Sequence, residues 1–424
     1  MTSEYIVFEE KYCTGCTQCI RACPIKAIRI KNNKAVCITS LCIGCGECIR
    51  VCPEGAISSA ISDEEPLEKE KINVAIVSPI LYAQFPGFMP NDVLLGLKQM
   101  GFDHAIDLSY YLEMFQYAVE EFIARNRKTN MAPWPLISPI CPVVNQLIAI
   151  KYPNLLDHIL PLKHPAGLVG NEIRKKLSQE HGVKEEDVIL YHITPCFSKV
   201  VSDRSGLMAE LSYMDKAIGI NKIYPGLLQK MEEIKDFELN LFPYEHFSFA
   251  PGARGPMWGM SGGEIAGMKL EKVIAVSGFK EIIAYIEKIE MGLLKDMEYI
   301  EFRACSEGCL GGPLTAVDRY LAKSTVQKFL KIFGIGRRVQ RKKVHMLYEK
   351  GWFFSELKPS ELADSYYLKQ TPLTIEDIKK IENLISVIQG NDCGACGAPD
   401  CKTFAEDVAR GYADVEDCFK MRQG

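Results

Sequence analysis

Cysteine is the residue type whose number and spacing offer the most chemistry in this chain. The 424 residues include seventeen cysteines, and all except Cys37 fall into three groups. Thiolates are the ligands that iron–sulfur clusters and other soft metal centres require. In a reducing compartment, cysteines at this density indicate metal binding rather than disulfides. The grouping therefore predicts thiolate-bound iron–sulfur clusters and one-electron chemistry.

The first group is a C-x2-C-x2-C-x3-C-P run that occurs twice. Its members are Cys13, Cys16, Cys19 and Cys23, and then Cys42, Cys45, Cys48 and Cys52. This is the bacterial ferredoxin spacing, in which three close cysteines hold one 4Fe–4S cube and the fourth reaches the other cube. We predict one cube on Cys13, Cys16, Cys19 and Cys52, and a second on Cys42, Cys45, Cys48 and Cys23. Zinc knuckles would instead need two C-x2-C pairs for each ion. Cys37 is predicted to pack between the repeats.

The last group closes the chain and consists of Cys393, Cys396, Cys401 and Cys418. Three of these thiols come from one short loop whose glycines let backbone amides approach the sulfurs. The following apolar residues have helical spacing, and such a helix would bring Cys418 back to the loop. The segment resembles the small helical 4Fe–4S domain of several anaerobic redox proteins, and a structural zinc is the alternative.

The middle group cannot be assigned from its spacing, because an isolated cysteine is commonly a small buried apolar residue. Its members are Cys141, Cys196, Cys305 and Cys309. Three of them directly follow predicted strands, at Leu136–Ile137, Val188–Ile193 and Met297–Phe302. Open α/β sheets keep their sites beyond the carboxyl ends of strands. We therefore predict that the four thiols meet in one crevice.

The elements that must position these cysteines alternate between short apolar strands and amphipathic helices, which favours α/β layers. Further strands are predicted at Ile72–Val77 and Val273–Val276, a helix is predicted to be capped by Asn91, and a last helix starts near Thr374. The predicted domains are a ferredoxin-like α+β module over 1–61, a charged linker over 62–71, an α/β domain over 72–370, and a small helical domain over 371–424.

Composition narrows the functional class. The net charge of −4 gives no electrostatic basis for nucleic-acid binding, and the basic run from Arg337 to Lys343 is predicted to be a solvated face. The N-terminus lacks the basic start and apolar run of a signal peptide, and no stretch has the ~20 apolar residues that cross a bilayer. We expect a cytoplasmic protein with no membrane contact.

Three segments around the middle cysteines share a family likeness. Ser138–Pro142, Thr194–Lys199 and Glu301–Pro313, in this order, resemble the signature segments of the iron-only (FeFe) hydrogenases. Ser261–Glu264 is similar to a turn of that family. The resemblance covers the whole chain, and it implies an FeFe-hydrogenase-like catalytic domain preceded by an accessory ferredoxin-like module.

The resemblance also implies a cofactor, the H-cluster. Cys141, Cys196, Cys305 and Cys309 would hold its 4Fe–4S part. Cys309 would bridge to a diiron unit that carries carbonyl, cyanide and a dithiolate bridge. Lys199 matches a lysine that donates to a cyanide, which is an anionic acceptor. Ser78 and Pro79 match a loop that lines the diiron unit, whereas His164 is predicted to be an ordinary packed or surface histidine.

The chain departs from the hydrogen-producing members at the positions that surround the metal. Ile140 replaces the cysteine that relays protons, and Thr194 and Arg303 replace methionines. Because general acid–base assistance is typically worth ~10²–10⁴ in rate, slow turnover is expected unless a water chain passes Ile140. Arg303 is predicted to shift the cluster potentials upward, unless it faces solvent or pairs with a carboxylate.

This pattern resembles the sensory branch of the family, whose members carry the extra C-terminal iron–sulfur domain. The resemblance implies a slow reaction of H2 to two protons and two electrons, a hydrogen-sensing role, and relay through the accessory clusters. The expected partners are a redox or signalling protein and the diiron maturation enzymes. Two alternatives stay open: an iron–sulfur carrier or assembly factor, and an electron-transfer hub without a functional diiron site. Lys199, Ser78 and Pro79 argue against the carrier or assembly factor, whereas the missing proton-relay cysteine argues for it. The hub predicts clusters that do not respond to hydrogen.

Overall fold

The chain forms two compact units in the computed structural model, which describes residues 6–59, 67–205, 214–235, 254–355, 361, 373–388 and 390–421. One unit comprises Met1–Ser62 together with Asp364–Gly424, and the other comprises Asp63–Ala363. The predicted boundaries at 61/62 and 370/371 lie outside the described residues, so the domain limits stay predictions.

The N-terminal part of the first unit repeats one structural motif twice. Its elements are β1 (Ile6–Phe8), α1 (Gln18–Ala22), β2 (Ile28–Lys31), β3 (Lys34–Cys37), α2 (Glu47–Val51) and β4 (Ile57–Ser59). β1 pairs antiparallel with β4, and β2 with β3. Each helix is preceded by a residue with positive φ, Thr17 at 66° and Gly46 at 74°. This turn lets the chain wrap tightly between two cysteines of the same run.

The C-terminal part of the same unit contains two helices. α15 (Ile375–Val387) begins after Thr374, whose hydroxyl accepts the Asp377 N–H in a capping box. The helix predicted to start near Thr374 is therefore confirmed. α16 (Cys401–Ala409) begins after Asp400, whose side chain accepts the Thr403 N–H. A small apolar core lies beside α16 and contains Ile388, Ala398, Phe404 and Cys418.

The second unit is built around a four-stranded parallel sheet in the order β6-β5-β8-β9. Its strands are β5 (Ile72–Val77), β6 (His104–Asp107), β8 (Val188–Thr194) and β9 (Lys216–Gly219). Alternate β5 residues enter two different cores, Val74 and Ile76 on one face and Ala75 and Val77 on the other. Both faces are covered, which explains why these strands read as continuous apolar runs.

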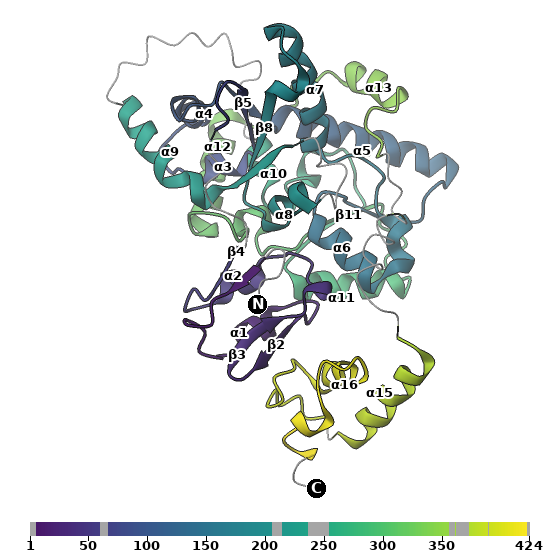
Figure 1. Ribbon diagram of the computed structural model, residues 1–424. Coiled ribbons are helices and arrows are strands. Elements are labelled where there is room, and N and C mark those ends of the chain that lie inside the picture. The colour runs from purple at the N-terminus through teal and green to yellow at the C-terminus, as the bar shows by residue number, and fades with distance from the viewer. Residues whose placement is uncertain are drawn as a thin grey trace. The chain divides into compact units, whose positions relative to one another are not determined.

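Helices cover both faces of this sheet (Figure 1). The core of Val74 and Ile76 contains side chains of α5 (Ser109–Thr129), α7 (Pro165–His181) and α13 (Arg341–Glu349). The opposite core contains side chains of α3 (Ile80–Ala83), α4 (Pro90–Gln99), α9 (Ile220–Lys235) and α12 (Arg319–Phe333). α4 starts at Pro90, two residues earlier than the predicted Asn91 cap implies. Met89 is its N-cap, because Pro90 fits the first helical position.

A second, three-stranded parallel sheet has the order β10-β11-β7. Its strands are β7 (Leu136–Ile137), β10 (Val273–Ser277) and β11 (Tyr299–Arg303). The other α-helices in the described part of this unit are α6 (Pro142–Lys151), α8 (Phe197–Ser205), α10 (Arg254–Trp258) and α11 (Phe279–Glu290). The strands predicted from sequence are confirmed, with ends shifted by one or two residues.

Among the described residues, no helix combines the length and apolar character that a membrane crossing requires.

Candidate metal centre

The middle cysteines lie at the carboxyl ends of strands, as predicted. Cys141 follows β7 and precedes α6, Cys196 follows β8 and precedes α8, and Cys305 follows β11. Cys309 lies in a short 3-10 helix, η7 (Gly308–Gly311). The strands belong to two different sheets, so the loops that carry these cysteines come from two sheets rather than from one sheet edge.

Backbone contacts join the loops of the two sheets. The Leu314 N–H donates to the Pro195 carbonyl at 3.1 Å. A Cβ added at Gly312 would lie 2.5 Å from the same carbonyl oxygen. Only a residue without a side chain allows this approach. The segment after Cys309 is thereby held against the segment before Cys196.

The thiols of this site lie close enough for the charge on one to change the pKa of another. Burial, together with negative charge on Cys141 and Cys309, raises the pKa of Cys196 to about 12, and the Lys199 ammonium opposes the rise. Burial also raises the pKa of Cys309, against the influence of Arg303 and Lys199. Buried thiolates this close repel one another unless a cation joins them. This donor set fits an iron–sulfur cluster on Cys141, Cys196, Cys305 and Cys309.

Arg303 is buried and paired with two carboxylates. Its side chain is 1% exposed, its Nη2 donates to Glu264 Oε2 at 2.6 Å, and its Nε lies 3.4 Å from Glu301 Oε1. The alternative of an arginine facing solvent is therefore wrong, and the alternative of a carboxylate pair is confirmed. Burial acts against the charged form, but the two glutamates hold the Arg303 pKa above its usual range.

The two glutamates fix the surrounding loops. Glu301 accepts backbone N–H groups from Gly262, Glu264 and Ile265 at 3.2, 3.1 and 3.3 Å. Glu264 accepts the hydroxyl of Tyr299, and that of Ser138 at 3.0 Å. The sequence patterns predict no role for Glu264, and Glu301 enters them only as the first residue of the Glu301–Pro313 segment. The available signal was a charged residue between Ile300 and Phe302 in an apolar strand.

Two nitrogens of Arg303, Nε and Nη1, are buried and have no hydrogen-bond partner within the described parts of the chain. Nε lies 3.4 Å from Glu301 Oε1, so Nη1 is the nitrogen that remains for a ligand. Negative charge on Cys309 and Cys141 contributes to the raised pKa of Arg303, which places the guanidinium beside the thiols. A buried donor without a partner is costly. An anionic thiolate-bound cluster would supply the missing acceptor, so this atom fits the cofactor that the donor set requires.

Lys199 contacts His164, which is 4% exposed. The Lys199 Nζ lies 2.9 Å from His164 Nε2. The Ala166 N–H donates to His164 Nδ1 at 3.1 Å, and burial holds the His164 pKa well below its ordinary value. A neutral ring that accepts at Nδ1 carries its proton on Nε2. A ring that accepts from the Lys199 ammonium at Nε2 carries its proton on Nδ1 instead, so the tautomer decides which of the two contacts is a hydrogen bond. In either case the ammonium has three N–H donors and His164 accepts at most one of them, so donors remain for an anionic ligand. The histidine is packed, as predicted, but it also orients the lysine.

The remaining predicted site residues flank the same strand ends. Ile140 is 3% exposed and offers no ionisable group. The Thr194 hydroxyl accepts the Cys196 N–H at 3.3 Å. The Ser78 N–H donates to the Ile193 carbonyl at 3.1 Å, so Ser78 and Pro79 leave β5 beside the point where β8 ends. The structure thus brings the Ser78 and Thr194 segments to adjacent positions.

The accessory cysteines also lie close enough to one another for the charge on one thiol to raise the pKa of another. Negative charge on Cys23, Cys48 and Cys42 contributes, after burial, to a strongly raised Cys45 pKa. Burial and charge on Cys13 and Cys16 raise the Cys19 pKa to about 11. In both repeats an amide donates to the fourth thiol, Ala27 N–H to Cys23 at 3.1 Å and Ala56 N–H to Cys52 at 3.3 Å. Cys37 lies beside Cys42.

At the C-terminal end, burial raises the pKa of Cys396, and negative charge on Cys418 and Cys393 adds to the rise. The Cys401 N–H donates to Asp392 at 2.8 Å. Cys418 is buried in the small core beside α16. The helix after the loop therefore returns the last cysteine to the other three, and the four thiols fit a thiolate-bound cluster.

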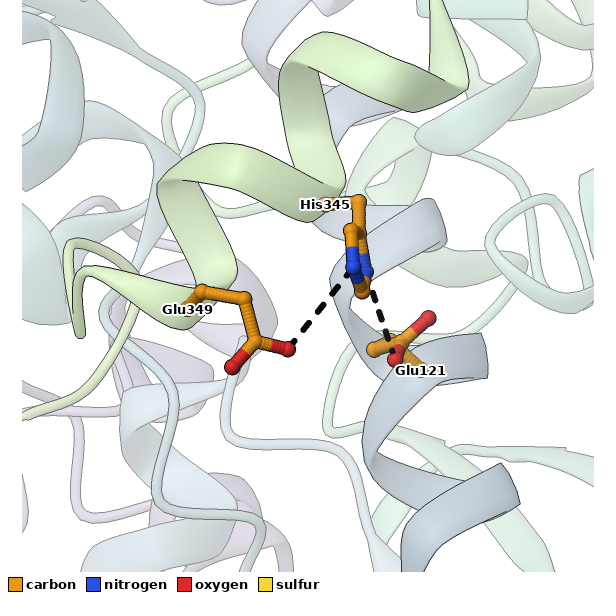
Figure 2. Close-up of side chains that lie close together, drawn as sticks. All are labelled: Glu121, His345 and Glu349. Atoms are coloured by element: carbon orange, nitrogen blue, oxygen red, sulfur yellow. Dashed lines mark ion pairs between the residues drawn. The ribbon is translucent and has the colours of Figure 1, made fainter.

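A second group of potential ligands lies between α5 and α13 (Figure 2). His345 lies between two carboxylates, with Nδ1 3.6 Å from Glu121 and Nε2 3.8 Å from Glu349. The Arg125 guanidinium already pairs with both glutamates and lies over the Tyr348 ring at 4.6 Å. The cluster is half-exposed and both of its carboxylates already pair with Arg125, so its evident role is to tie two helices together.

Three family models match the chain. The model for the iron-only hydrogenase large subunit, C-terminal domain, matches residues 71–219 and 252–313. A 4Fe–4S dicluster domain matches residues 5–65, and a model for a proposed Fe–S cluster matches residues 388–419.

Two curated proteins are similar to parts of the chain. The periplasmic [Fe] hydrogenase large subunit of Nitratidesulfovibrio vulgaris is 28% identical over 247 residues, which are 51% of this chain and 59% of that protein. The cytosolic Fe–S cluster assembly factor NAR1 of Botryotinia fuckeliana is 25% identical over 211 residues, which are 44% of this chain and 35% of that protein. The chain thus spans less than two thirds of either relative.

The fold is also similar to that of solved structures. An [FeFe]-hydrogenase structure that concerns oxygen inactivation through its H-cluster 2Fe subcluster superposes with a TM-score of 0.51 and 15% identity. The match covers 72% of this chain and 95% of that chain. At this identity the likeness concerns the fold alone.

Proposed function

Because residues 71–219 and 252–313 belong to the iron-only hydrogenase large-subunit family, we propose that the protein reacts with molecular hydrogen at the site of Cys141, Cys196, Cys305 and Cys309. The products are two protons and two electrons. The electrons pass to the iron–sulfur clusters of the N-terminal dicluster segment and the C-terminal segment.

The observation that carries the proposal is the arrangement of donors around the middle thiols. Arg303 Nη1 has no hydrogen-bond partner among the described residues and is buried beside Cys141 and Cys309, and Lys199 Nζ contacts His164. An H-cluster is rich in anionic acceptors, and charge-assisted hydrogen bonds to them are strong. A plain thiolate-bound cubane is also anionic, so the two donors favour an anionic cluster, and the match of Lys199, Ser78 and Pro79 to the family favours the diiron unit.

The residues divide into three roles. The four thiolates would hold the H-cluster, which supplies the iron centre at which hydrogen is taken up and split. Arg303 and Lys199 would orient and stabilise its anionic ligands, and Glu264 and His164 hold these two cations in place. Ser78 and Pro79 would exclude water from the open side of the site.

Ile140 accounts for the slow rate that we propose. The side chain is buried and cannot take up a proton at the position of the family's relay cysteine. Without general acid–base assistance, typically worth ~10²–10⁴ in rate, hydrogen binding and electron exchange persist while proton release slows. This balance suits a hydrogen sensor that passes its signal to a redox or signalling partner. The dense cysteines suit the reducing cytoplasm.

Infrared spectroscopy tests the proposal directly. Protein produced anaerobically with the diiron maturation enzymes should show carbonyl and cyanide bands, and these bands should shift when hydrogen is added. Full loading of the cubane clusters without any such bands would contradict the proposal.

A second candidate function is iron–sulfur carriage or assembly, which the similarity to NAR1 of Botryotinia fuckeliana favours. The absence of a thiol at Ile140 is also compatible with it. Under this function the cubane clusters load and are donated to an acceptor protein, and hydrogen leaves the infrared and electron paramagnetic resonance (EPR) spectra unchanged. The same infrared experiment therefore separates the two functions.

A further inference from the structure

A buried ion pair joins the C-terminal iron–sulfur segment to the N-terminal module. Arg29 of β2 donates through Nε and Nη2 to the two carboxylate oxygens of Asp407 in α16, and the two side chains are 5% and 6% exposed. The remaining Arg29 nitrogen, Nη1, donates to the carbonyls of Lys26 and Ile28 at 2.6 and 2.9 Å. A buried pair whose hydrogen bonds are all made fixes one relative position of its partners.

A backbone contact brings the C-terminal ligand loop onto the edge of β2. The Ile30 N–H donates to the Gly397 carbonyl at 2.8 Å. A Cβ added at Gly397 would lie 1.9 Å from the Ile30 carbonyl oxygen, and the Gly397 φ is +80°. Both facts require glycine at this position. The loop thus approaches β2 as an additional edge segment.

Two more contacts flank this one. Lys26 forms an ion pair with Asp400, and Lys31 Nζ donates to the Tyr412 carbonyl at 2.8 Å. The carboxylate of Asp400 also caps α16. Three cationic side chains on one strand and the turn before it thus meet carboxylates and a carbonyl of the C-terminal segment, which gives the interface charge complementarity.

These contacts are made by the neighbours of predicted cluster ligands. Gly397 follows Cys396, and Asp400 precedes Cys401. Ile30 pairs with Ala35 of β3, whose N–H donates to Cys13 Sγ at 3.4 Å. A short path of covalent and hydrogen bonds therefore runs from the ligand loop of the C-terminal cluster to a thiol of the N-terminal module.

We propose that this interface is an electron-transfer contact, through which the C-terminal cluster exchanges single electrons directly with the N-terminal pair. One cluster of the N-terminal module is oxidised from the 1+ to the 2+ state while the C-terminal cluster is reduced from 2+ to 1+, or the reverse. No bond is made or broken, and no proton moves. The proposal rests on the accessory clusters of the proposed function and is independent of any reaction with hydrogen.

The test is EPR of the full chain, reduced stepwise with a low-potential europium(II) chelate in the absence of hydrogen. We expect the N-terminal cluster signals to be broadened by spin–spin interaction with the reduced C-terminal cluster. The broadening should disappear in Cys393→Ala, which removes a ligand of the C-terminal cluster. N-terminal signals that are identical with and without the C-terminal cluster would overturn the proposal.

Variants of the interface distinguish loss of the contact from loss of the C-terminal cluster. Gly397→Val should remove the broadening and raise hydrogen–deuterium exchange at the Ile30 amide at least tenfold, with iron content retained. Glu406→Gln removes a charge next to Asp407 in α16 and should leave both readouts unchanged. Rapid hydrogen–deuterium exchange of the Ile30 amide in the unaltered protein would overturn the proposal. A Gly397→Val variant whose N-terminal EPR signals stay broadened would also overturn it. Protein that lacks carbonyl and cyanide bands but shows the broadening would contradict the proposed function and leave this inference intact.

Discussion

At the scale of single residues, the middle site places two cationic side chains beside its thiols. Arg303 and Lys199 lie near the thiols, and each is held by a buried partner, Glu264 or His164. Ile140 adds an apolar wall. The polar groups are therefore arranged to stabilise negative charge on a bound group rather than to carry protons away from it.

Restoring a thiol at residue 140 should restore proton transfer. Ile140→Cys is expected to raise the rate of hydrogen oxidation by at least ~10²-fold, the lower range of general acid–base assistance. The rate is measured with an artificial electron acceptor on matured protein. Ile140→Val, which changes volume without adding a proton carrier, should gain nothing. A cysteine variant with normal carbonyl bands and an unchanged rate would show that water already carries the protons.

Removing the Arg303 charge should destabilise the second unit. Arg303→Met leaves Glu264 and Glu301 buried without their cation, and breaking a buried pair in this way costs about 3–5 kcal/mol. A lower thermal midpoint is expected for Arg303→Met, with partial recovery in Arg303→Met/Glu264→Gln. Equal midpoints for the single variant and the unaltered protein would mean that the network adds no stability. Cluster potentials measured on the same proteins test whether Arg303, although paired with Glu264 and Glu301, still shifts the potentials upward.

Asp107 should make stability depend on pH. Burial raises the pKa of Asp107 from 3.8 to about 6, although the Ser109 amide and hydroxyl hold it down. The folded protein thus keeps a proton that the unfolded chain releases between these two values. Stability falls as pH rises through this window, and the full cost above it is about 3 kcal/mol.

Asp107→Asn removes this dependence and is expected to raise the thermal midpoint at pH 7.5 more than at pH 5. The midpoints of the loaded protein are compared with those of the variant at each pH, so that acid loss of clusters affects both alike. Asp296→Asn, at an exposed position, serves as the control. A difference between the two proteins that grows toward low pH would contradict the assignment.

At the scale of elements, the site depends on loops from two sheets that meet through backbone atoms. β8 belongs to one sheet, and β7 and β11 belong to the other. The contact of Gly312 and Leu314 with the Pro195 carbonyl joins the two. Neither sheet alone presents all four cysteines, so the distance between the loops decides whether a cluster can bind.

A methyl group at this contact should prevent cluster binding at the middle site. Gly312→Ala places a Cβ 2.5 Å from the Pro195 oxygen and must push the loops apart. We expect iron to be lost from the middle site while the accessory clusters keep their EPR signals. Gly336→Ala adds the same group where no atom lies within 4 Å and should load fully. Full iron in Gly312→Ala would show that the loops tolerate the separation.

At the scale of the whole molecule, the chain places its two terminal segments in one unit and the hydrogenase-like α/β domain in the other. The predicted fold class is confirmed by the family matches and by the fold shared with an [FeFe]-hydrogenase. The first unit is held together by contacts between residues nearly 380 positions apart, such as Arg29 and Asp407.

A double-mutant cycle should measure this long-range contact. Arg29→Met and Asp407→Leu each leave one buried charge unpaired, at a cost of about 3–5 kcal/mol, so each is expected to lower the unfolding midpoint of the first unit. The double variant should lose less than the sum of the two, because no unpaired charge remains. Unfolding is followed by loss of cluster absorbance. Additive effects would indicate that the two side chains do not interact in solution.

The sequence by itself determined the features that depend on local spacing. Thiol spacing is set by the reach of a few consecutive residues around a cube, so the ferredoxin runs are read without tertiary information. The strand ends that carry Cys141 and Cys196 follow from short apolar runs, because strands buried on both faces need apolar side chains throughout.

Only the tertiary structure decided which distant groups meet. Glu264 lies in a loop and Arg303 at the end of β11, and His164, the N-cap of α7, reaches Lys199 of α8. The sequence also did not predict that two sheets contribute to the middle site, or that Ile30 binds the Gly397 carbonyl. The physical reason is common to all four. Hydrogen bonds and ion pairs between remote segments depend on how layers pack, and packing has no signature in the spacing of residues along the chain.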